Sequence, residues 1–157
     1  MADSILRFPI TRHYISDVKR FAYRFNLRLE IESRDGEFVS LPFRLDTGSD
    51  FMTIPQWMAR TNNIPYSGRS PLFPNTASGR ADKPSYLSPV EFSFPQLPKS
   101  KFQTHCVFSP YNLPYCLLSL SDFVPHFIIR SNKESTDFPD GSVVLQLRAD
   151  HGGQPRS

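Results

Sequence analysis

The sequence predicts a single all-β domain with one or two short helices. Its 157 residues are enough for one domain with a real core and too few for two. Proline (15 residues) outnumbers glycine (7 residues), and proline breaks helix interiors but is accepted at edges, turns and helix starts. Several segments alternate apolar and polar residues with the two-residue period of a β-strand. The 14 phenylalanines supply apolar volume for a core.

The N-terminal segment, residues 1–22, shows no clean periodicity. Three apolar residues could line one face of a short helical turn, namely Ile15, Val18 and Phe21. We treat residues 1–22 as an N-terminal extension. Its role stays open between a cleavable propiece, a strand at a dimer interface and a partner-binding arm.

The clearest strands lie in residues 24–45. Apolar residues alternate with polar ones in two runs, first Phe25, Leu27, Leu29 and Ile31, then Val39, Leu41, Phe43 and Leu45. Asp35-Gly36 between the runs is a typical two-residue turn. The pattern predicts a β-hairpin whose second strand leads directly into Asp46.

Beyond Asp46 the sequence predicts one helix and further strands. Pro55 is expected to open a short helix over residues 56–60, because proline is favoured at the first helical position. Residues 62–89 are rich in Asn, Pro, Ser and Gly, which predicts an exposed excursion. Strands are expected at residues 90–94, 102–108, 127–129 and 143–147, with an apolar run at 115–120. The tail, residues 149–157, is expected to be flexible.

One short motif carries candidate chemistry. Leu45-Asp46-Thr47-Gly48-Ser49 places a carboxylate at the end of an apolar strand. Gly48 would let backbone N–H groups approach that carboxylate, and the hydroxyls of Thr47 and Ser49 could orient it. A surface turn capped by aspartate is the alternative for so short a motif. The preceding strand and the following apolar run and helix favour a catalytic interpretation.

With these neighbours the chain resembles the retropepsin-like aspartic proteases, the family of the retroviral proteases and their single-domain relatives. The resemblance covers roughly residues 24–148 and rests on Leu45–Ser49, on Thr76-Ala77-Ser78-Gly79 and on Leu117-Leu118-Ser119-Leu120-Ser121-Asp122. It implies a retropepsin-like closed barrel over residues 23–148, the homodimeric acid protease fold. It also implies that Asp46, Thr47 and Gly48 are catalytic. Substrate would be contacted by Ser49 and by a flap containing Thr76, Ala77, Ser78 and Gly79.

The segment from Leu117 to Asp122 departs from the family at one position. Ser119 stands where the family has glycine. Because serine is small, we expect this segment still to cross the loop that carries Asp46. Asp122 is expected to be structural, with a helix N-cap as the open alternative.

The implied chemistry needs two carboxyl groups that share one proton, because two carboxyl groups about 3 Å apart cannot both be ionised. The nearest second motif, Asp150-His151-Gly152, has histidine in place of the hydroxyl and only five residues after it. We therefore expect a C2 homodimer that pairs two copies of Asp46 and cleaves a peptide or protein substrate without a cofactor. The rival is an inactive dimerisation or peptide-binding module with the same fold.

Other classes of function have weaker support. The net charge of +3 comes from scattered Lys and Arg, so no nucleic acid partner is expected. The residues His105, Cys106, Cys116 and His126 match no metal-binding spacing, so no metal is expected. The two cysteines are expected to be reduced core thiols.

Met1–Ile10 lacks the apolar core of a signal peptide, and no stretch approaches the length of a membrane span. We expect a cytoplasmic protein without a membrane partner. Trp57 is expected to serve in packing of the helix, with a ligand-stacking role as the alternative. Asp50 is expected to be solvated, or to pair with an arginine across the dimer as the resemblance implies.

Overall fold

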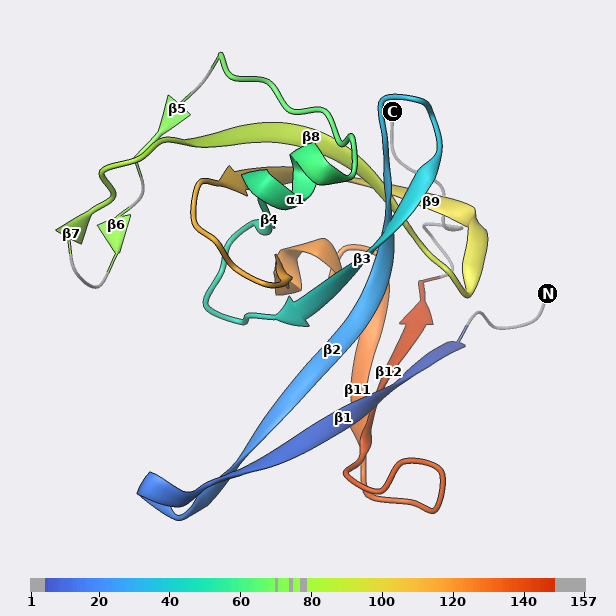
Figure 1. The fold of residues 1–157 in the computed structure, drawn as a ribbon. Coiled ribbons are helices and arrows are strands. Elements are labelled where there is room, and N and C mark those ends of the chain that lie inside the picture. Colours follow the sequence, from blue (N-terminus) through green and yellow to red (C-terminus); the bar gives the residue numbers. More distant parts are fainter. Residues whose placement is uncertain (1–4, 70, 74, 77–78, 149–157) are drawn as a thin grey trace.

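A computed structural model describes residues 5–69, 71–73, 75–76 and 79–148. Its main feature is a curved ten-stranded sheet with the order β11-β12-β1-β2-β3-β10-β4-β9-β8-β5 (Figure 1). The strands are β1 (Ile5–Ile15), β2 (Arg20–Glu32), β3 (Phe38–Leu45), β4 (Met52–Pro55), β5 (Pro71–Leu72), β8 (Ser85–Phe94), β9 (Leu97–Ser109), β10 (Cys116–Leu118), β11 (Phe127–Asn132) and β12 (Ser142–Leu147). Two further strands, β6 (Asn75–Thr76) and β7 (Gly79–Arg80), form a separate pair. The described residues also form one α-helix, α1 (Gln56–Thr61), and two 3-10 turns, η1 (Ser16–Val18) and η2 (Leu120–Asp122). The predicted all-β class is confirmed.

Six strands surround the core in the order β2, β3, β10, β4, β9 and β8, and β8 pairs again with β2. This last contact has only two residue pairs, Glu30 with Ser93 and Ile31 with Phe92. The register of β8 and β9 shifts immediately afterwards, between Ser93 and Phe94. The sheet therefore returns on itself over a short stretch, and the predicted closed barrel is not clearly closed.

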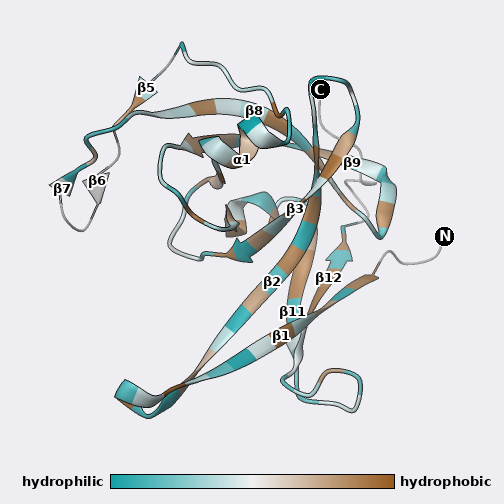
Figure 2. Cartoon of the chain, in the orientation of Figure 1, coloured by the Kyte–Doolittle hydropathy of each residue, from teal (hydrophilic) through white to brown (hydrophobic). Residues whose placement is uncertain are grey.

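The core is largely aromatic. Seven phenylalanines are almost completely buried, namely Phe43, Phe92, Phe94, Phe102, Phe108, Phe123 and Phe127. Their rings make edge-to-face and stacked contacts, such as Phe94 with Phe127 at a centroid distance of 5.2 Å, a geometry that adds about 0.5–1.5 kcal/mol per pair to the burial of apolar area. Figure 2 shows hydrophobic and hydrophilic bands alternating along β2, as the sequence predicts.

The hairpin predicted at residues 24–45 is confirmed. β2 and β3 pair from Asn26 and Arg44 to Glu32 and Phe38. The connection covers residues 33–37 and is longer than the predicted two-residue turn, with Gly36 at a φ of +77°. The N–H of Ser33 donates to the carbonyl oxygen of Glu37 at 2.7 Å, which closes this loop.

The predicted helix is also present, with a different start. Gln56 is its first residue, and Pro55 is the N-cap with a φ of −60° and a ψ of 135°. Pro55 is the last residue of β4. The helix therefore begins one residue later than the preference for proline at the first helical position suggests.

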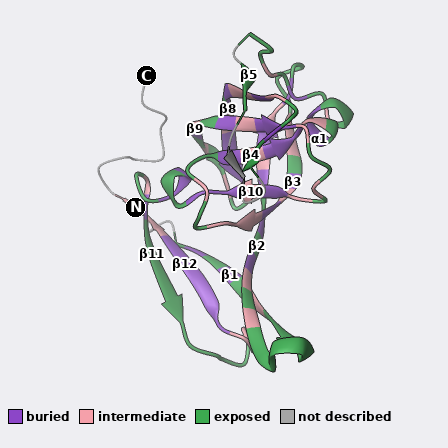
Figure 3. Cartoon of the chain, turned by 90° about the vertical axis from the view of Figure 1, so that its left-hand side faces the viewer, coloured by how far each residue is buried: buried purple, intermediate pink, exposed green. Residues whose placement is uncertain are grey.

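Residues 1–22 contain a strand that periodicity did not indicate. β1 pairs with β12 through Ile5–Pro9 and with β2 through Ile10–Ile15. Leu6 and Phe8 are buried, whereas residues 11–24 are exposed or half-buried. These residues, which we call the arm, project from the body as a two-stranded ribbon with η1 at its tip (Figures 1 and 3). Of the three residues predicted to line a helical turn, only Val18 lies in η1, whereas Ile15 ends β1 and Phe21 belongs to β2.

The excursion predicted at residues 62–89 contains β5, β6 and β7, and the described part of these three strands is exposed where burial is given. β8 begins at Ser85, five residues before the predicted strand. The tail, residues 149–157, lies outside the described residues.

Candidate active site

Asp46 follows the last residue of β3, and the backbone around it is held by β10. β10 runs parallel to β3 and pairs Leu118 with Leu45. The N–H of Asp46 donates to the carbonyl oxygen of Leu118 at 2.9 Å. Because β10 also pairs with β4, the same short strand fixes both ends of the loop that carries Asp46.

The carboxylate of Asp46 is half-exposed and has a backbone donor. The N–H of Gly48 donates to Oδ1 of Asp46 at 3.0 Å. A Cβ atom built on Gly48 would lie 3.4 Å from the same oxygen, which is an ordinary van der Waals distance. The hydrogen bond itself therefore does not require a residue without a side chain, and the predicted need for glycine stays a prediction.

The two hydroxyl residues of the motif take different positions. Thr47 is exposed. The hydroxyl of Ser49 donates to the carbonyl oxygen of Phe51 at 2.7 Å, so it is directed along the loop and not toward the carboxylate. The N–H of Ser49 donates to the carbonyl oxygen of Asp46 at 3.2 Å and tightens the turn.

Ser119 ties this loop to the end of β10. Its side chain is buried, with 1% of its surface exposed. Its hydroxyl donates to the carbonyl oxygen of Ser49 at 2.6 Å and accepts from the N–H of Ser121 at 3.1 Å. The serine that stands in place of the family glycine thus makes a hydrogen bond to the Asp46 loop that glycine cannot make.

Asp122 is a buried structural carboxylate. Its Oδ2 accepts from the N–H of Ser119 at 2.9 Å, and its Oδ1 accepts from the hydroxyl of Thr104 at 2.7 Å. Burial raises the pKa of Asp122, and these two hydrogen bonds oppose the rise. The alternative in which Asp122 is the N-cap is wrong, because Ser119 caps η2 and Asp122 completes the capping box from within the turn.

Two hollows adjoin the Asp46 loop. One, of about 420 Å³, is lined by Asp46, Thr47, Arg44, Leu45 and Val143 together with Ile10, Tyr23, Arg24 and Phe25 at the base of the arm. The other, of about 490 Å³, is lined by Gly48, Ser49, Asp50, Phe51, Thr53, Leu72, Ser85, Val107, Ser109 and Tyr111. The loop thus separates an arm-side hollow from a hollow that runs toward β5.

The predicted flap segment is described only in part. Thr76 pairs with Gly79 across the β6–β7 hairpin, and Gly79 has a φ of +118°. Ala77 and Ser78 lie outside the described residues. The hairpin lies at the outer end of the excursion, on the side of the molecule toward which β3 points (Figure 1).

The remaining residues considered from the sequence lie away from the loop or within the core. Trp57 is 37% exposed, and its Nε1–H donates to the carbonyl oxygen of Leu113 at 2.9 Å. Cys106 and Cys116 are buried free thiols. Burial raises the pKa of the Cys116 thiol to about 12 and also raises the pKa of Cys106. Among the described residues, no group of three His, Cys, Asp or Glu could hold a metal ion.

Asp50 is exposed and has no ion pair within the described part of the chain. No α-helix in that part is long and apolar enough to cross a membrane.

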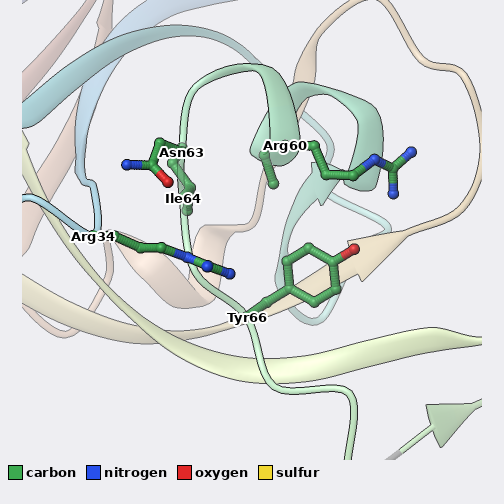
Figure 4. Close-up of a pocket in the computed structure, with 6 residues that line it drawn as sticks. Arg34, Arg60, Asn63, Ile64 and Tyr66 are labelled. Atoms are coloured by element: carbon green, nitrogen blue, oxygen red, sulfur yellow. The ribbon is translucent and has the colours of Figure 1, made fainter.

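A third pocket shares no residue with these two hollows. It measures about 440 Å³ and is lined by Arg34, Ala59, Arg60, Asn63, Ile64 and Tyr66. Figure 4 shows the side chain of Arg34 extending toward the ring of Tyr66. Arg34 belongs to the β2–β3 connection, at the opposite end of β3 from Asp46. Sequence reasoning gave no sign of this pocket, because its residues come from the β2–β3 connection, from α1 and from the loop that follows α1.

Comparison with known proteins gives a result at the level of the fold. No family profile and no curated protein sequence matches the chain. The structure is similar to the crystal structure of a retropepsin-like aspartic protease from Rickettsia conorii, with a TM-score of 0.57 and 13% sequence identity over 94% of this chain and 95% of that chain. The chain has a retropepsin-like fold.

A second solved structure, a foamy viral protease-reverse transcriptase in complex with an RNA/DNA hybrid, matches with a TM-score of 0.37 and 21% identity over 62% of this chain. This chain spans 11% of the length of that protein. The retropepsin-like resemblance noted in the sequence is therefore supported for the fold, through the Rickettsia conorii structure.

Proposed function

We propose that this chain is one half of a homodimeric aspartic endopeptidase and that Asp46 is its catalytic carboxylate. Fold alone does not establish activity, so the proposal rests chiefly on one observation. The Asp46 carboxylate is half-exposed, and the N–H of Gly48 holds one of its oxygens at 3.0 Å on a loop fixed by β10. A carboxylate held in this way has a defined orientation and remains open to solvent and substrate.

The proposal requires two chains. Asp-Thr-Gly occurs once in the sequence, at Asp46. General acid–base cleavage by carboxylates needs a second carboxylate, so that one is ionised while the other holds the proton. Thr47, the next residue, is exposed and available to meet its counterpart. A twofold axis beside the loop would supply the missing group.

The proposed reaction follows from this pairing. One Asp46 carboxylate removes a proton from a water bound between the two chains, and the water oxygen attacks the carbonyl carbon of the scissile peptide. The other Asp46, which is protonated, donates its proton to the carbonyl oxygen. The intermediate collapses when the C–N bond breaks. The amine nitrogen receives the proton that was taken from water, and the hydroxyl formed from the carbonyl oxygen returns its proton to the second Asp46, which restores the shared-proton pair.

We place the substrate along the hollow that begins at Gly48 and Ser49. Its far side includes the apolar side chains of Leu72, Val107 and Tyr111, which suit an apolar side chain of a bound peptide. In this proposal the β6–β7 hairpin, with Thr76 to Gly79, is the flap that covers the peptide.

The test compares wild-type protein with Asp46→Asn in a peptide-library cleavage assay, with oligomeric state measured on the same samples. Asp35→Asn is the matched control, because Asp35 is exposed at the opposite end of β3. We expect cleavage by the wild type and the control and none by Asp46→Asn. Activity should be highest at acidic pH, because the pair must hold one proton.

Two outcomes would contradict the proposal. Equal cleavage by Asp46→Asn and wild type would remove Asp46 from the chemistry. A confirmed wild-type dimer without cleavage from about pH 3 to about pH 7 would favour the inactive dimerisation or peptide-binding module.

A further inference from the structure

We infer that the arm, residues 11–24, is a dimerisation element whose aromatic face packs against a second copy of this chain. The inference rests on the proposed function, because that function requires a second copy beside Asp46. It adds the surface that would hold the two copies together.

The register of β1 and β2 gives the arm two distinct faces. Residues paired directly across an antiparallel ribbon project to the same side. One side, the aromatic face, carries Arg12, Tyr14, Phe21 and Tyr23. The other side, the polar face, carries Thr11, His13, Ile15, Arg20, Ala22 and Arg24. Large aromatic side chains are thus confined to one side of the ribbon.

The aromatic face is strongly exposed in the single chain. The exposed fractions are 59% for Tyr14, 44% for Phe21 and 61% for Tyr23. Tyr14 and Phe21 contact each other edge to face at 5.3 Å, and the guanidinium of Arg12 lies 4.5 Å from the ring of Phe21. Clustered Tyr, Phe and Arg side chains are typical of the centre of a protein–protein interface.

The aromatic face continues the core face of the same two strands. Phe8, Ile10 and Phe25 lie on that side within the body, where Phe8 and Phe25 are buried. Beyond Ile10 this side carries Arg12 and the three aromatic side chains. Arg12 forms ion pairs with Glu134 and Asp140 of the β11–β12 connection, but no other strand of the described chain covers the aromatic side chains (Figure 3). A two-stranded ribbon is marginally stable in water without such a cover. The arm therefore has the pattern of a structure completed by a partner.

The position of the arm identifies the partner as a second copy. Tyr23 and Ile10 line the same hollow as Asp46 and Thr47. A chain that brought its own Asp46 to this site would lie directly against the base of the aromatic face. The proposed chemistry requires a second chain over Asp46 and Thr47. The aromatic face of the arm begins at the same hollow, so one partner chain could cover both.

Interface size supports the same partner. A specific dimer buries about 800 Å² on each protomer, which the five-residue loop Asp46–Asp50 cannot supply alone. In a twofold dimer each arm packs on the other protomer, so one surface is used twice. Most of the polar face, including Arg20, would remain in water, whereas Arg24 lines the hollow beside Asp46.

The test measures self-association of the full chain by sedimentation equilibrium. The variant is the double substitution Tyr14→Ser and Tyr23→Ser, and the control is Ile15→Ser, which removes an apolar side chain from the polar face. All proteins also carry Asp46→Asn, so that association is measured without cleavage. We expect a dimer of twice the 18.0 kDa chain mass, weakened at least about tenfold by the double variant and unchanged by Ile15→Ser.

Hydrogen–deuterium exchange of the chain without arm substitutions gives a second readout that does not depend on the folding of variants. Exchange at residues 11–24 should slow when the protein concentration is raised above the dimer dissociation constant. The inference is overturned by a monomer, by a double variant that dimerises as the control does, or by exchange in the arm that does not change with concentration. A dimer that depends on the arm but never cleaves peptides would refute the proposed function and leave this inference intact.

Discussion

Asp46 and Asp122 show how differently two aspartates behave in one small domain. Asp46 is half-exposed and receives a hydrogen bond from one backbone N–H, whereas Asp122 is 2% exposed and accepts from Ser119 and Thr104. Asp46 could be singled out from the sequence as a candidate because a strand, the motif and a helix follow one another locally. The hydrogen bond from Ser119 to Ser49 spans 70 positions, and no local pattern reports a contact of that length.

Substitution of Asp122 separates the effect of its charge from that of its hydrogen bonds. Burial raises the pKa of Asp122 in the folded state, so ionisation costs more in the folded than in the unfolded protein. The free energy of unfolding of the wild type should therefore fall as pH rises from the ordinary aspartate range to the raised pKa. Asp122→Asn is neutral and can keep both hydrogen bonds if the Thr104 hydroxyl reverses its direction. We expect its stability relative to wild type to increase with pH over that window.

Asp122→Ala is the comparison, because it loses both hydrogen bonds. It should lower the free energy of unfolding by about 1–3 kcal/mol, the cost of leaving buried donors without partners. Urea denaturation of the three proteins over a pH series measures both effects. A difference between Asp122→Asn and wild type that does not vary with pH would contradict this account of the buried charge.

At the scale of the elements, β10 organises the site although it has only three residues. It pairs with β3 and β4 and ends at Ser119, whose hydroxyl reaches the Asp46 loop. Ser119→Ala should lower the free energy of unfolding by about 1–2 kcal/mol, because it removes an N-cap and a buried hydrogen bond. Cleavage activity should fall with it, since the loop loses its support.

Ser121→Ala is the matched control for that substitution, because the Ser121 side chain is exposed and its residue contributes only a backbone N–H to Ser119. Its stability should stay within about 0.5 kcal/mol of wild type. Chemical denaturation that cannot distinguish the two variants would show that the Ser119 hydroxyl does not support the loop.

Elements with a local signal were predictable, and elements that depend on distant partners were not. The alternation in β2 and β3 is visible because one side of each strand faces the core. β1 was missed because its outer half, within the arm, has no core beneath it. The start of β8 was missed because residues 85–89 have a turn-like composition and become a strand by pairing with β9, a case in which tertiary context overrides local preference.

The whole molecule has a retropepsin-like fold in which β8 meets β2 over only two residue pairs. The sequence predicted the class of this fold but not the extent of its closure, because closure depends on the register between strands about sixty residues apart. The structure also places the Asp46 loop and the base of the arm around one hollow. This arrangement links the proposed catalytic residue to the inferred dimer surface.

The central claim is that catalysis needs one Asp46 from each of two chains. It is tested most directly by mixing wild-type and Asp46→Asn chains at constant total concentration, under conditions in which subunits exchange and dimers predominate, and measuring cleavage. If both copies are required, activity should follow the square of the wild-type fraction, so an equal mixture keeps about one quarter of the activity. Activity proportional to the wild-type fraction, with about one half remaining in that mixture, would show that each chain works alone and would contradict the claim.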